Sequence, residues 1–184
     1  EMLYWNRTNV IQKPGMELVV PRYYVYEDVP LRTDMRGDSS HIAFDYILDA
    51  GRTPIHSYCD LSIGLRHMPD TTKYYIVQKA GKWRSSMGGK YANGWIKTRV
   101  RSLGTFSVDV DTIAPQITPI GQGGWRTSRN IRFRIKDMES GIGSYKVYID
   151  GKFVLFGLKK GILVIQDPEK VKKGVPHKLQ VTVT

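Results

Sequence analysis

Residues 103–120 read Leu103-Gly-Thr-Phe-Ser-Val-Asp-Val-Asp-Thr-Ile-Ala-Pro-Gln-Ile-Thr-Pro-Ile120, and the organisation of the chain follows from this stretch. Phe106, Val108 and Val110 alternate with polar residues, which is the period-two pattern of a strand with one buried face. Residues 111–115 interrupt the pattern, and apolar alternation resumes at Ile117. We therefore expect the last strand of one β-domain, a short stiff linker and the first strand of a second β-domain.

The residues before this junction predict a larger β-domain over residues 1–112. Short apolar segments recur at the regular spacing of a β-sandwich, with Gly, Pro and Asp between them. We expect a lead-in over residues 1–15, an extended segment at 23–26, a polar loop at 30–40 and a turn at 67–70. Roughly seven strands are expected, and the clearest of them cover residues 16–20, 41–49, 58–65, 74–79, 95–101 and 103–110.

The residues after the junction predict a smaller β-domain over residues 113–184. Apolar and basic residues alternate from Ile131 to Lys136, so the apolar side chains should face inward and the basic ones outward. Asp150-Gly151 is a type I′ hairpin signal. About six strands are expected. The last, over residues 179–183, stops without a turn or a polar tail, which predicts a domain trimmed at its C-terminus. The fold prediction is therefore all-β, with two tandem antiparallel β-sandwiches.

The composition indicates attraction to polyanions. The formal net charge is +11 and the pI is about 9.7, so nucleic acid, anionic envelope polymers and acidic glycans are the candidate partners. The alternative is a generally basic surface without a specific partner. No apolar run is long enough to predict a membrane span, and no signal peptide opens the chain at Glu1. We expect either a cytosolic protein or a piece of a longer protein, and the strand that stops at Thr184 favours the second.

No pattern in the sequence predicts catalysis. The four histidines stand singly, and the His41…Asp45 spacing provides only two ligands where a zinc site needs more. Cys59 alternates in step with apolar residues, which predicts a buried, unreactive thiol. Phosphate-binding loops, nucleophile motifs and paired carboxylates are absent. We predict that this chain is not an enzyme and has no catalytic residues, no metal ligands and no cofactor.

Acidic residues near the junction raise one metal alternative. Asp109 and Asp111, together with Asp137 and Glu139, could gather calcium between two domains. Turns and linkers are also rich in acidic residues for conformational reasons. We therefore expect these four acidic residues to belong to a turn and a linker, and not to a calcium site.

The candidate binding surface is a stripe along one strand. Trp95, Lys97, Arg99 and Arg101 share a face because side chains at i, i+2 and i+4 of a strand align. An aromatic ring beside three cations suits stacking on a sugar or holding a polyanion. The alternative is an ordinary charged outer face, on which the basic stems cover Trp95.

Three segments resemble one family of proteins. They are Gly15-Met-Glu-Leu-Val-Val-Pro21, Gly104-Thr-Phe-Ser-Val-Asp-Val-Asp-Thr-Ile-Ala-Pro115 and Ile135-Lys-Asp-Met-Glu-Ser-Gly-Ile142, which continues to Ile149-Asp-Gly-Lys152. They resemble the non-catalytic C-terminal region of lysostaphin-like zinc metallopeptidases from Bacteroidetes, which is built of immunoglobulin-like β-sandwiches. The final strand, Pro176–Thr184, is similar to the last strand of that region.

The resemblance implies an accessory role at the cell envelope. It implies two immunoglobulin-like domains that position a peptidoglycan endopeptidase at the wall. Partners would be a catalytic domain upstream in the same protein and an anionic cell-wall polymer or glycan, and nucleic acid is not an expected partner. The location would be the periplasm or the extracellular envelope of a bacterium. The alternative is a standalone carbohydrate-binding or surface-adhesion β-sandwich protein.

Overall fold

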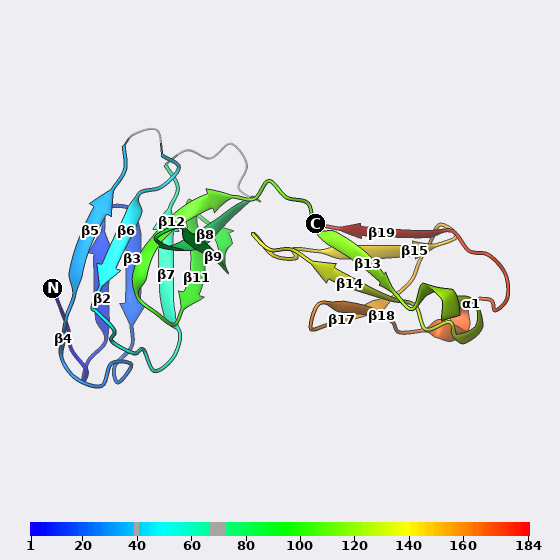
Figure 1. Ribbon diagram of the computed structural model, residues 1–184, viewed down its shortest axis with the longest axis horizontal. Coiled ribbons are helices and arrows are strands. Elements are labelled where there is room, and N and C mark those ends of the chain that lie inside the picture. Colours follow the sequence, from blue (N-terminus) through cyan, green and yellow to red (C-terminus); the bar gives the residue numbers. More distant parts are fainter. Residues whose placement is uncertain (39–40, 67–72) are drawn as a thin grey trace. The chain divides into compact units, whose positions relative to one another are not determined.

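A computed structural model describes residues 1–38, 41–66 and 73–184. The chain divides into two compact units, Glu1–Thr112 and Ile113–Thr184, here called unit 1 and unit 2. Both consist of antiparallel sheets, so the predicted all-β class is confirmed (Figure 1). The helical elements among the described residues are short, and they are η1 (Gln122–Gly124), α1 (Trp125–Ser128) and η2 (Pro168–Lys170).

Unit 1 contains two five-stranded sheets. The first has the order β10-β11-β7-β3-β2, the second has the order β5-β6-β12-β8-β9, and β1 pairs with β4 in a separate ribbon. The bounds are β1 Met2–Leu3, β2 Asn9–Lys13, β3 Met16–Val20, β4 Val29–Pro30, β5 Arg32–Arg36, β6 Asp45–Asp49, β7 Cys59–Gly64, β8 Tyr74–Ala80, β9 Trp83–Gly88, β10 Lys90–Ala92, β11 Trp95–Val100 and β12 Gly104–Val110.

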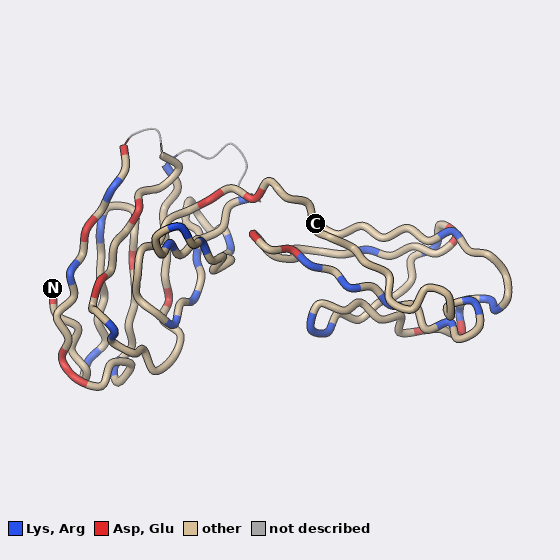
Figure 2. Tube along the Cα trace, viewed as in Figure 1, with Lys and Arg blue, Asp and Glu red and all other residues tan. Residues whose placement is uncertain are grey.

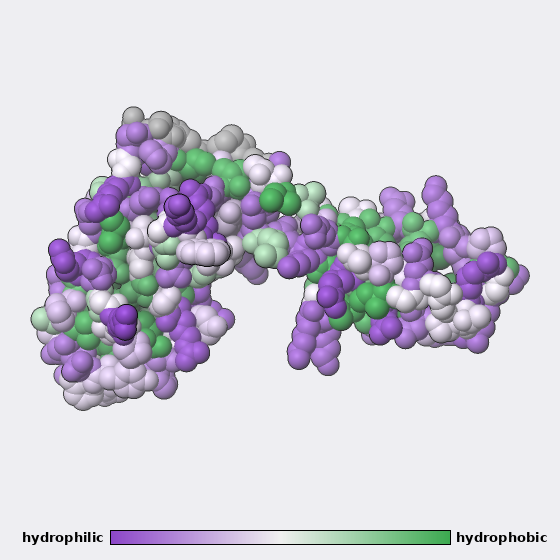
Figure 3. Space-filling view, viewed as in Figure 1, coloured by the Kyte–Doolittle hydropathy of each residue, from purple (hydrophilic) through white to green (hydrophobic). Residues whose placement is uncertain are grey.

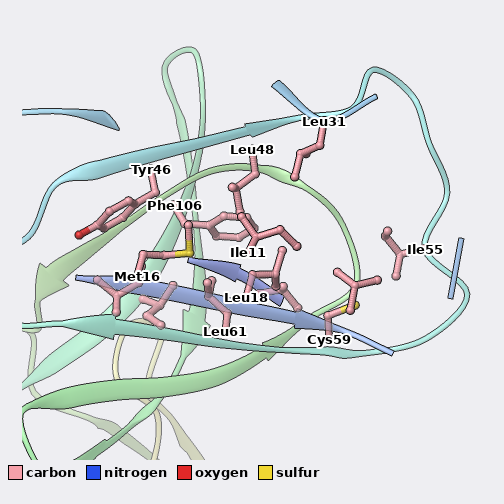
Figure 4. Packing of buried hydrophobic residues seen from close by; sticks show 14 of the residues in the cluster. Ile11, Met16, Leu18, Leu31, Tyr46, Leu48, Ile55, Cys59, Leu61 and Phe106 are labelled. Atoms are coloured by element: carbon pink, nitrogen blue, oxygen red, sulfur yellow. The ribbon is translucent and has the colours of Figure 1, made fainter. Parts of the chain in front are cut away.

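The core of unit 1 lies between these two sheets. Leu18 and Leu61 enter it from the first sheet, and Leu48 and Phe106 enter it from the second (Figure 4). All four side chains are at most 1% exposed. Alternation along β3, β7 and β12 therefore buries one face of each sheet against the other, which makes unit 1 a β-sandwich. The thiol of Cys59 lies in the same core, as the alternation predicts.

Six strands of unit 1 are not predicted by the sequence, and four of them, β2, β5, β9 and β10, are the edge strands of the two five-stranded sheets. Residues 9–13 were expected to be a lead-in, yet they form β2, in which Asn9 faces inward. The Asn9 amide is satisfied there, since it accepts from the Tyr4 N–H at 2.8 Å and donates to the Tyr4 carbonyl at 2.8 Å. Residues 32–36, expected to be a polar loop, form β5, which buries no side chain fully. Apolar alternation is weak in both strands because an edge strand covers little of the core.

Two other expectations for unit 1 are wrong. Residues 23–26 turn instead of continuing extended, because Tyr23 adopts φ 67° while its N–H donates to the Trp5 carbonyl at 2.7 Å. The strand expected over residues 41–49 begins only at Asp45, because the Ile42 carbonyl accepts from the Arg66 N–H instead of a neighbouring strand. The predicted turn at residues 67–70 lies outside the described residues.

Unit 2 consists of a four-stranded and a three-stranded sheet. The first has the order β13-β14-β18-β17 and the second β16-β15-β19. Phe133 and Leu163 of the first sheet pack with Val147 and Ile149 of the second in a single core. The strand bounds are β13 Gln116–Ile120, β14 Arg132–Lys136, β15 Tyr145–Ile149, β16 Lys152–Phe153, β17 Phe156–Lys159, β18 Ile162–Ile165 and β19 Leu179–Val183.

In unit 2 the facing of the side chains along β14 and the hairpin at Asp150-Gly151 are confirmed, whereas the segment after this hairpin and the number of strands differ from the expectation. Asp150 and Gly151 both have positive φ at the turn between β15 and β16, as a type I′ hairpin requires. The chain then leaves that sheet after Phe153, and Phe156 starts β17 in the opposite sheet. Unit 2 therefore has seven strands.

The turn after β14 depends on Asp137 and Gly141. One carboxylate oxygen of Asp137 accepts from the N–H of Glu139 at 2.8 Å and of Gly141 at 3.2 Å. Gly141 has φ +85°, and a Cβ placed there would meet no atom within 4 Å. A side chain at this position would therefore strain the backbone without clashing.

We predict that Gly141→Val lowers the free energy of unfolding of unit 2 by about 1–3 kcal/mol, the usual cost of a strained backbone position. Chemical denaturation measures the change. Gly123→Val is the matched control, because Gly123 has equally open surroundings and no positive φ. Equal effects of the two substitutions would exclude backbone strain as the cause.

Candidate functional site

The predicted stripe lies on the outer face of the first sheet of unit 1. Ile96 and Val100 of β11 are buried, so Trp95, Lys97 and Arg99 project to the opposite side. Arg101 follows directly after the end of the strand and is exposed. Trp95 is half-buried over Gly64, where a Cβ would lie 3.7 Å from the indole ring. The predicted alignment therefore holds for Trp95, Lys97 and Arg99 but not for Arg101, which lies outside β11, and the binding role stays a prediction.

Acidic residues on neighbouring strands offset the charge of this stripe. Arg99 lies opposite Asp60 of β7, and Lys97 lies opposite Ser62, which in turn lies opposite Glu17 of β3. Residues directly opposite one another in a sheet share a face. On its other side Lys97 faces Lys90. On the strands of this face, three cations (Lys90, Lys97 and Arg99) thus stand beside two carboxylates (Asp60 and Glu17), which weakens the face as a site for a polyanion.

An aromatic cluster extends the stripe at the end of β11. The guanidinium of Arg99 lies 5.6 Å from the ring centroid of Tyr58, and Arg101 donates to the His56 carbonyl at 3.4 Å. The His56 ring contacts Tyr26 edge-on, and its Nδ1 lies 3.0 Å from the Tyr26 hydroxyl. Tyr26 and Tyr58 are 66% and 53% exposed. This cluster was not predicted from the sequence, although the run Arg22-Tyr-Tyr-Val-Tyr26 signals it.

A second, more strongly basic surface lies on unit 2. Arg132, Arg134 and Lys136 of β14 alternate with the buried Phe133 and Ile135, and so they project from the outer face of the four-stranded sheet. Figure 2 shows Lys and Arg along β14 and at the turn between β17 and β18. We call this surface the basic face, and it comprises Arg132, Arg134, Lys136 and Lys159 with the apolar Ile162 and Val164 between them.

The register of the sheet places these side chains together. Arg134 lies opposite Ile162 of β18, and Ile162 lies opposite Lys159 of β17. On the other side, Arg134 lies opposite Thr118 of β13. Long hydrophilic side chains project from the visible surface of unit 2 between apolar areas (Figure 3). Successive cations on β14 are about 7 Å apart, because a strand rises roughly 3.4 Å per residue.

The basic face carries no opposing charge. Residues 113–184, all of which the structure describes, contain 13 Lys and Arg against 5 Asp and Glu, a formal net charge of +8. The register pairs place no Asp or Glu on the outer face of this sheet. Unit 2 therefore supplies most of the net positive charge of the chain, +8 of +11, and its basic face has no carboxylate on the same side of the sheet.

The titratable residues considered for catalysis are engaged elsewhere. His41 bonds to Asp38 at 3.0 Å, whereas Asp45 pairs with Lys79 at 2.6 Å. Burial raises the pKa of Cys59 to about 11, with a further contribution from the Asp60 charge, so the thiol stays protonated at neutral pH. Within the described ranges, no group of three His, Cys, Asp or Glu side chains is placed to hold a metal ion.

The acidic residues considered for calcium also have protein partners. Asp109 pairs with Arg84 at 2.7 Å in unit 1, and the Asp137 carboxylate accepts backbone N–H groups in unit 2. The structure thus gives Asp109 and Asp137 local structural roles.

His177 holds the segment before β19 in unit 2. Its Nδ1 lies 2.6 Å from the Asp150 carboxylate, and its Nε2 lies 2.8 Å from the Lys172 carbonyl. Both partners are acceptors, so both bonds form only when the imidazole is protonated. The bond to Asp150, followed by that to Lys172, raises the pKa of His177, and the bonds from His177 and the Lys178 N–H lower the pKa of Asp150.

We predict a pH-dependent stability of unit 2 from this pair. The raised pKa of His177 means that its contribution is fully present below pH 6.5 and is lost as the pH rises through the folded-state value. The lowered pKa of Asp150 means that its contribution is lost as the pH falls below 3.8 through the folded-state value. The melting temperature of unit 2 should therefore fall as the pH rises from 6 towards 8.

His177→Gln is the matching variant, because His177 is the one histidine in residues 113–184. It should abolish this fall in the melting temperature of unit 2 while leaving the transition of unit 1 unchanged. A variant that kept the full pH dependence would contradict the role assigned to His177.

Comparison with known families identifies unit 1. The sequence model of the Zu5-like domain family matches residues 1–111. The chain belongs to the Zu5-like family. The match ends one residue before the boundary of unit 1 at Thr112, so the Zu5-like domain and unit 1 are the same body. No curated protein and no solved structure matches the chain.

The two candidate surfaces fall on different sides of this boundary. The predicted stripe and the aromatic cluster belong to the Zu5-like domain, whereas the basic face lies in residues 113–184, outside the family match. In the described part of the chain, no helix is both long and apolar enough to cross a membrane.

Proposed function

We propose that this chain is a non-catalytic binding region that holds its parent protein at an anionic polymer of the bacterial cell envelope. The observation that carries the proposal is the basic face of unit 2, where aligned cations stand without a carboxylate among them. In the proposal the parent is a lysostaphin-like peptidoglycan metallopeptidase, its catalytic domain lies upstream, and the location is the periplasm or the extracellular envelope.

The physics of such a surface favours a repeating polyanion over a single small anion. Each exposed cation alone contributes little, because water and salt screen it. Several cations about 7 Å apart engage successive charges of one polymer, and their contributions combine. Binding of this kind is long-range and strongly salt-dependent. Ile162 and Val164 lie between the cations and form an apolar surface for the polymer to contact.

The sheet order of unit 2 supports the immunoglobulin-like part of the proposal. In an immunoglobulin-like domain one sheet contains strands A, B, E and D in that order. The four-stranded sheet of unit 2 follows the same order, with β13, β14, β18 and β17 as these strands. The strands β15 and β19 would then correspond to C and F. Asp-Gly hairpins and the Asp137–Ile142 turn are the sequence features that support the resemblance to the peptidase region.

Cosedimentation with purified cell-wall sacculi tests the proposal. Sacculi that retain their covalently attached anionic polymers should bind the chain at low salt and release it as the salt concentration rises. Sacculi stripped of these polymers should bind it much more weakly. Equal binding to both preparations, or binding insensitive to salt, would contradict a polyanion as the ligand. A zinc peptidase domain encoded upstream of Glu1 in the same gene would test the assignment of the parent enzyme.

The aromatic cluster of the Zu5-like domain favours a second candidate function, a carbohydrate-binding module. Tyr26 and Tyr58 are exposed beside His56, Arg99 and Arg101, and such rings stack on sugars while the polar groups bond to hydroxyls. Trp83 is 79% exposed on β9, whereas Trp95 and Trp125 are only partly exposed. This function predicts salt-insensitive binding to neutral glycans, lost in Tyr58→Ala.

A further inference from the structure

Unit 2 contains a pocket that is separate from the basic face. It lies between α1, the segment around Val171 and Lys172, and the start of β19, with a volume of about 340 Å³. Pockets that bind small molecules have volumes of about 300–1,000 Å³ and combine apolar walls with a few polar groups. The pocket is therefore large enough for a compact ligand.

The walls of the pocket are apolar and held in place. Trp125, Ile131, Val171 and Leu179 contribute to them. The Trp125 indole N–H donates to the Ile120 carbonyl at 3.0 Å, and its ring packs edge-on against Phe133 at 5.1 Å. Because these contacts fix the indole in one orientation, its ring forms a rigid wall.

The charge that lines the pocket is positive. Arg126, Lys172 and His177 line it, and no Asp or Glu does so among residues 113–184, all of which are described. Arg126 donates one Nη2 bond to the Gly174 carbonyl at 3.1 Å, and its guanidinium has further donors. The Lys172 ammonium has no ion-pair or hydrogen-bond partner among the described residues. A ligand with a negative group would satisfy both cations.

The segment that closes the pocket is tied to its surroundings from two sides. The Gly174 N–H donates back to the Arg126 carbonyl at 3.2 Å, so Arg126 and Gly174 form a reciprocal pair. His177 connects the Lys172 carbonyl to Asp150. Because the site is largely preformed, a ligand would bind with only a small entropic cost for ordering the protein.

We propose that this pocket binds a small organic acid, with an apolar body against Trp125 and Val171 and its carboxylate at Arg126 and Lys172. This site does not depend on polymer binding, because it shares no residue with the basic face. A neutral molecule of the same shape would leave both cations unpaired and would bind more weakly.

NMR titration of the full chain with 4-phenylbutyrate tests this inference, with 4-phenylbutanamide as the neutral isostere. The acid should shift amide signals of residues 125–126 and 171–179 saturably, with a millimolar or lower Kd. The neutral 4-phenylbutanamide should bind at least about tenfold more weakly, because it makes no charge-assisted contact with either cation. Equal binding of acid and amide, or no saturable shift in these residues, would overturn the proposal.

Three variants test the site separately from the fold. Lys172→Gln removes a cation that supports no other contact, so it should weaken acid binding about tenfold at unchanged melting temperature. Arg134→Gln, on the basic face, is the control and should leave acid binding unchanged. Acid binding that resisted Lys172→Gln and Arg126→Gln in folded protein would exclude these cations as its partners.

Discussion

Phe106→Ala is expected to lower the free energy of unfolding of unit 1 by about 3–5 kcal/mol, the range for removing a buried aromatic ring. The Phe106 side chain is 0% exposed and lies between the two sheets, where it contacts the cluster that contains Leu18, Leu48 and Leu61. Truncation would leave a cavity that β-sheet backbones fill poorly. Differential scanning calorimetry and chemical denaturation measure the loss.

The same variant tests whether the units unfold separately. Each unit has its own core, so Phe106→Ala should shift the transition of unit 1 and leave that of unit 2 in place. Leu163→Ala, which leaves a cavity in the core of unit 2, should shift the transition of unit 2 and leave that of unit 1 in place. A single transition shifted equally by both substitutions would contradict two independently stable units.

The second large effect concerns the basic face. We expect Arg134→Gln combined with Lys136→Gln to weaken binding to heparin, a soluble linear polyanion, by at least about tenfold at low salt. The slope of log K against log salt concentration should decrease in magnitude by about 1–2, because binding releases fewer counterions from the polyanion when two cations have been removed. Both side chains are exposed and bond to no core group, so the melting temperature of unit 2 should not change.

A matched pair on the predicted stripe is the control for this effect. Lys97→Gln combined with Arg99→Gln removes the same charge from unit 1, next to Asp60 and Glu17. It should reduce heparin binding much less than the substitutions on β14. A larger loss from the stripe variant would move the polymer site to the Zu5-like domain and would restore the prediction made from the sequence.

Strands that bury one face could be predicted from the sequence. Phe106 and Val108 in β12, and Phe133 and Ile135 in β14, alternate with polar residues in the sequence, and both pairs enter a core. Edge strands escaped prediction, since Asn9 faces inward in β2 through bonds to the Tyr4 backbone that no periodic pattern encodes. The later start of β6 likewise depends on Arg66, which is distant in the sequence.

The candidate site could be predicted only in part, for a related reason. The alignment of Trp95, Lys97 and Arg99 follows from strand geometry alone. The acids that offset their charge lie on other strands, and only the register reveals that Asp60 faces Arg99. The pairing of Arg134 with Ile162 and Lys159 on the basic face also depends on the register. A site formed by side chains from separate strands therefore cannot be predicted without the structure.

The most direct test of the central claim is an NMR titration of the isotope-labelled full chain with a short heparin oligosaccharide at low salt. We predict that the largest shifts occur at Arg132–Lys136 and at residues 159–164, and that they reverse when salt is added. Shifts confined to β11 and the aromatic cluster, with none on β14, would contradict it.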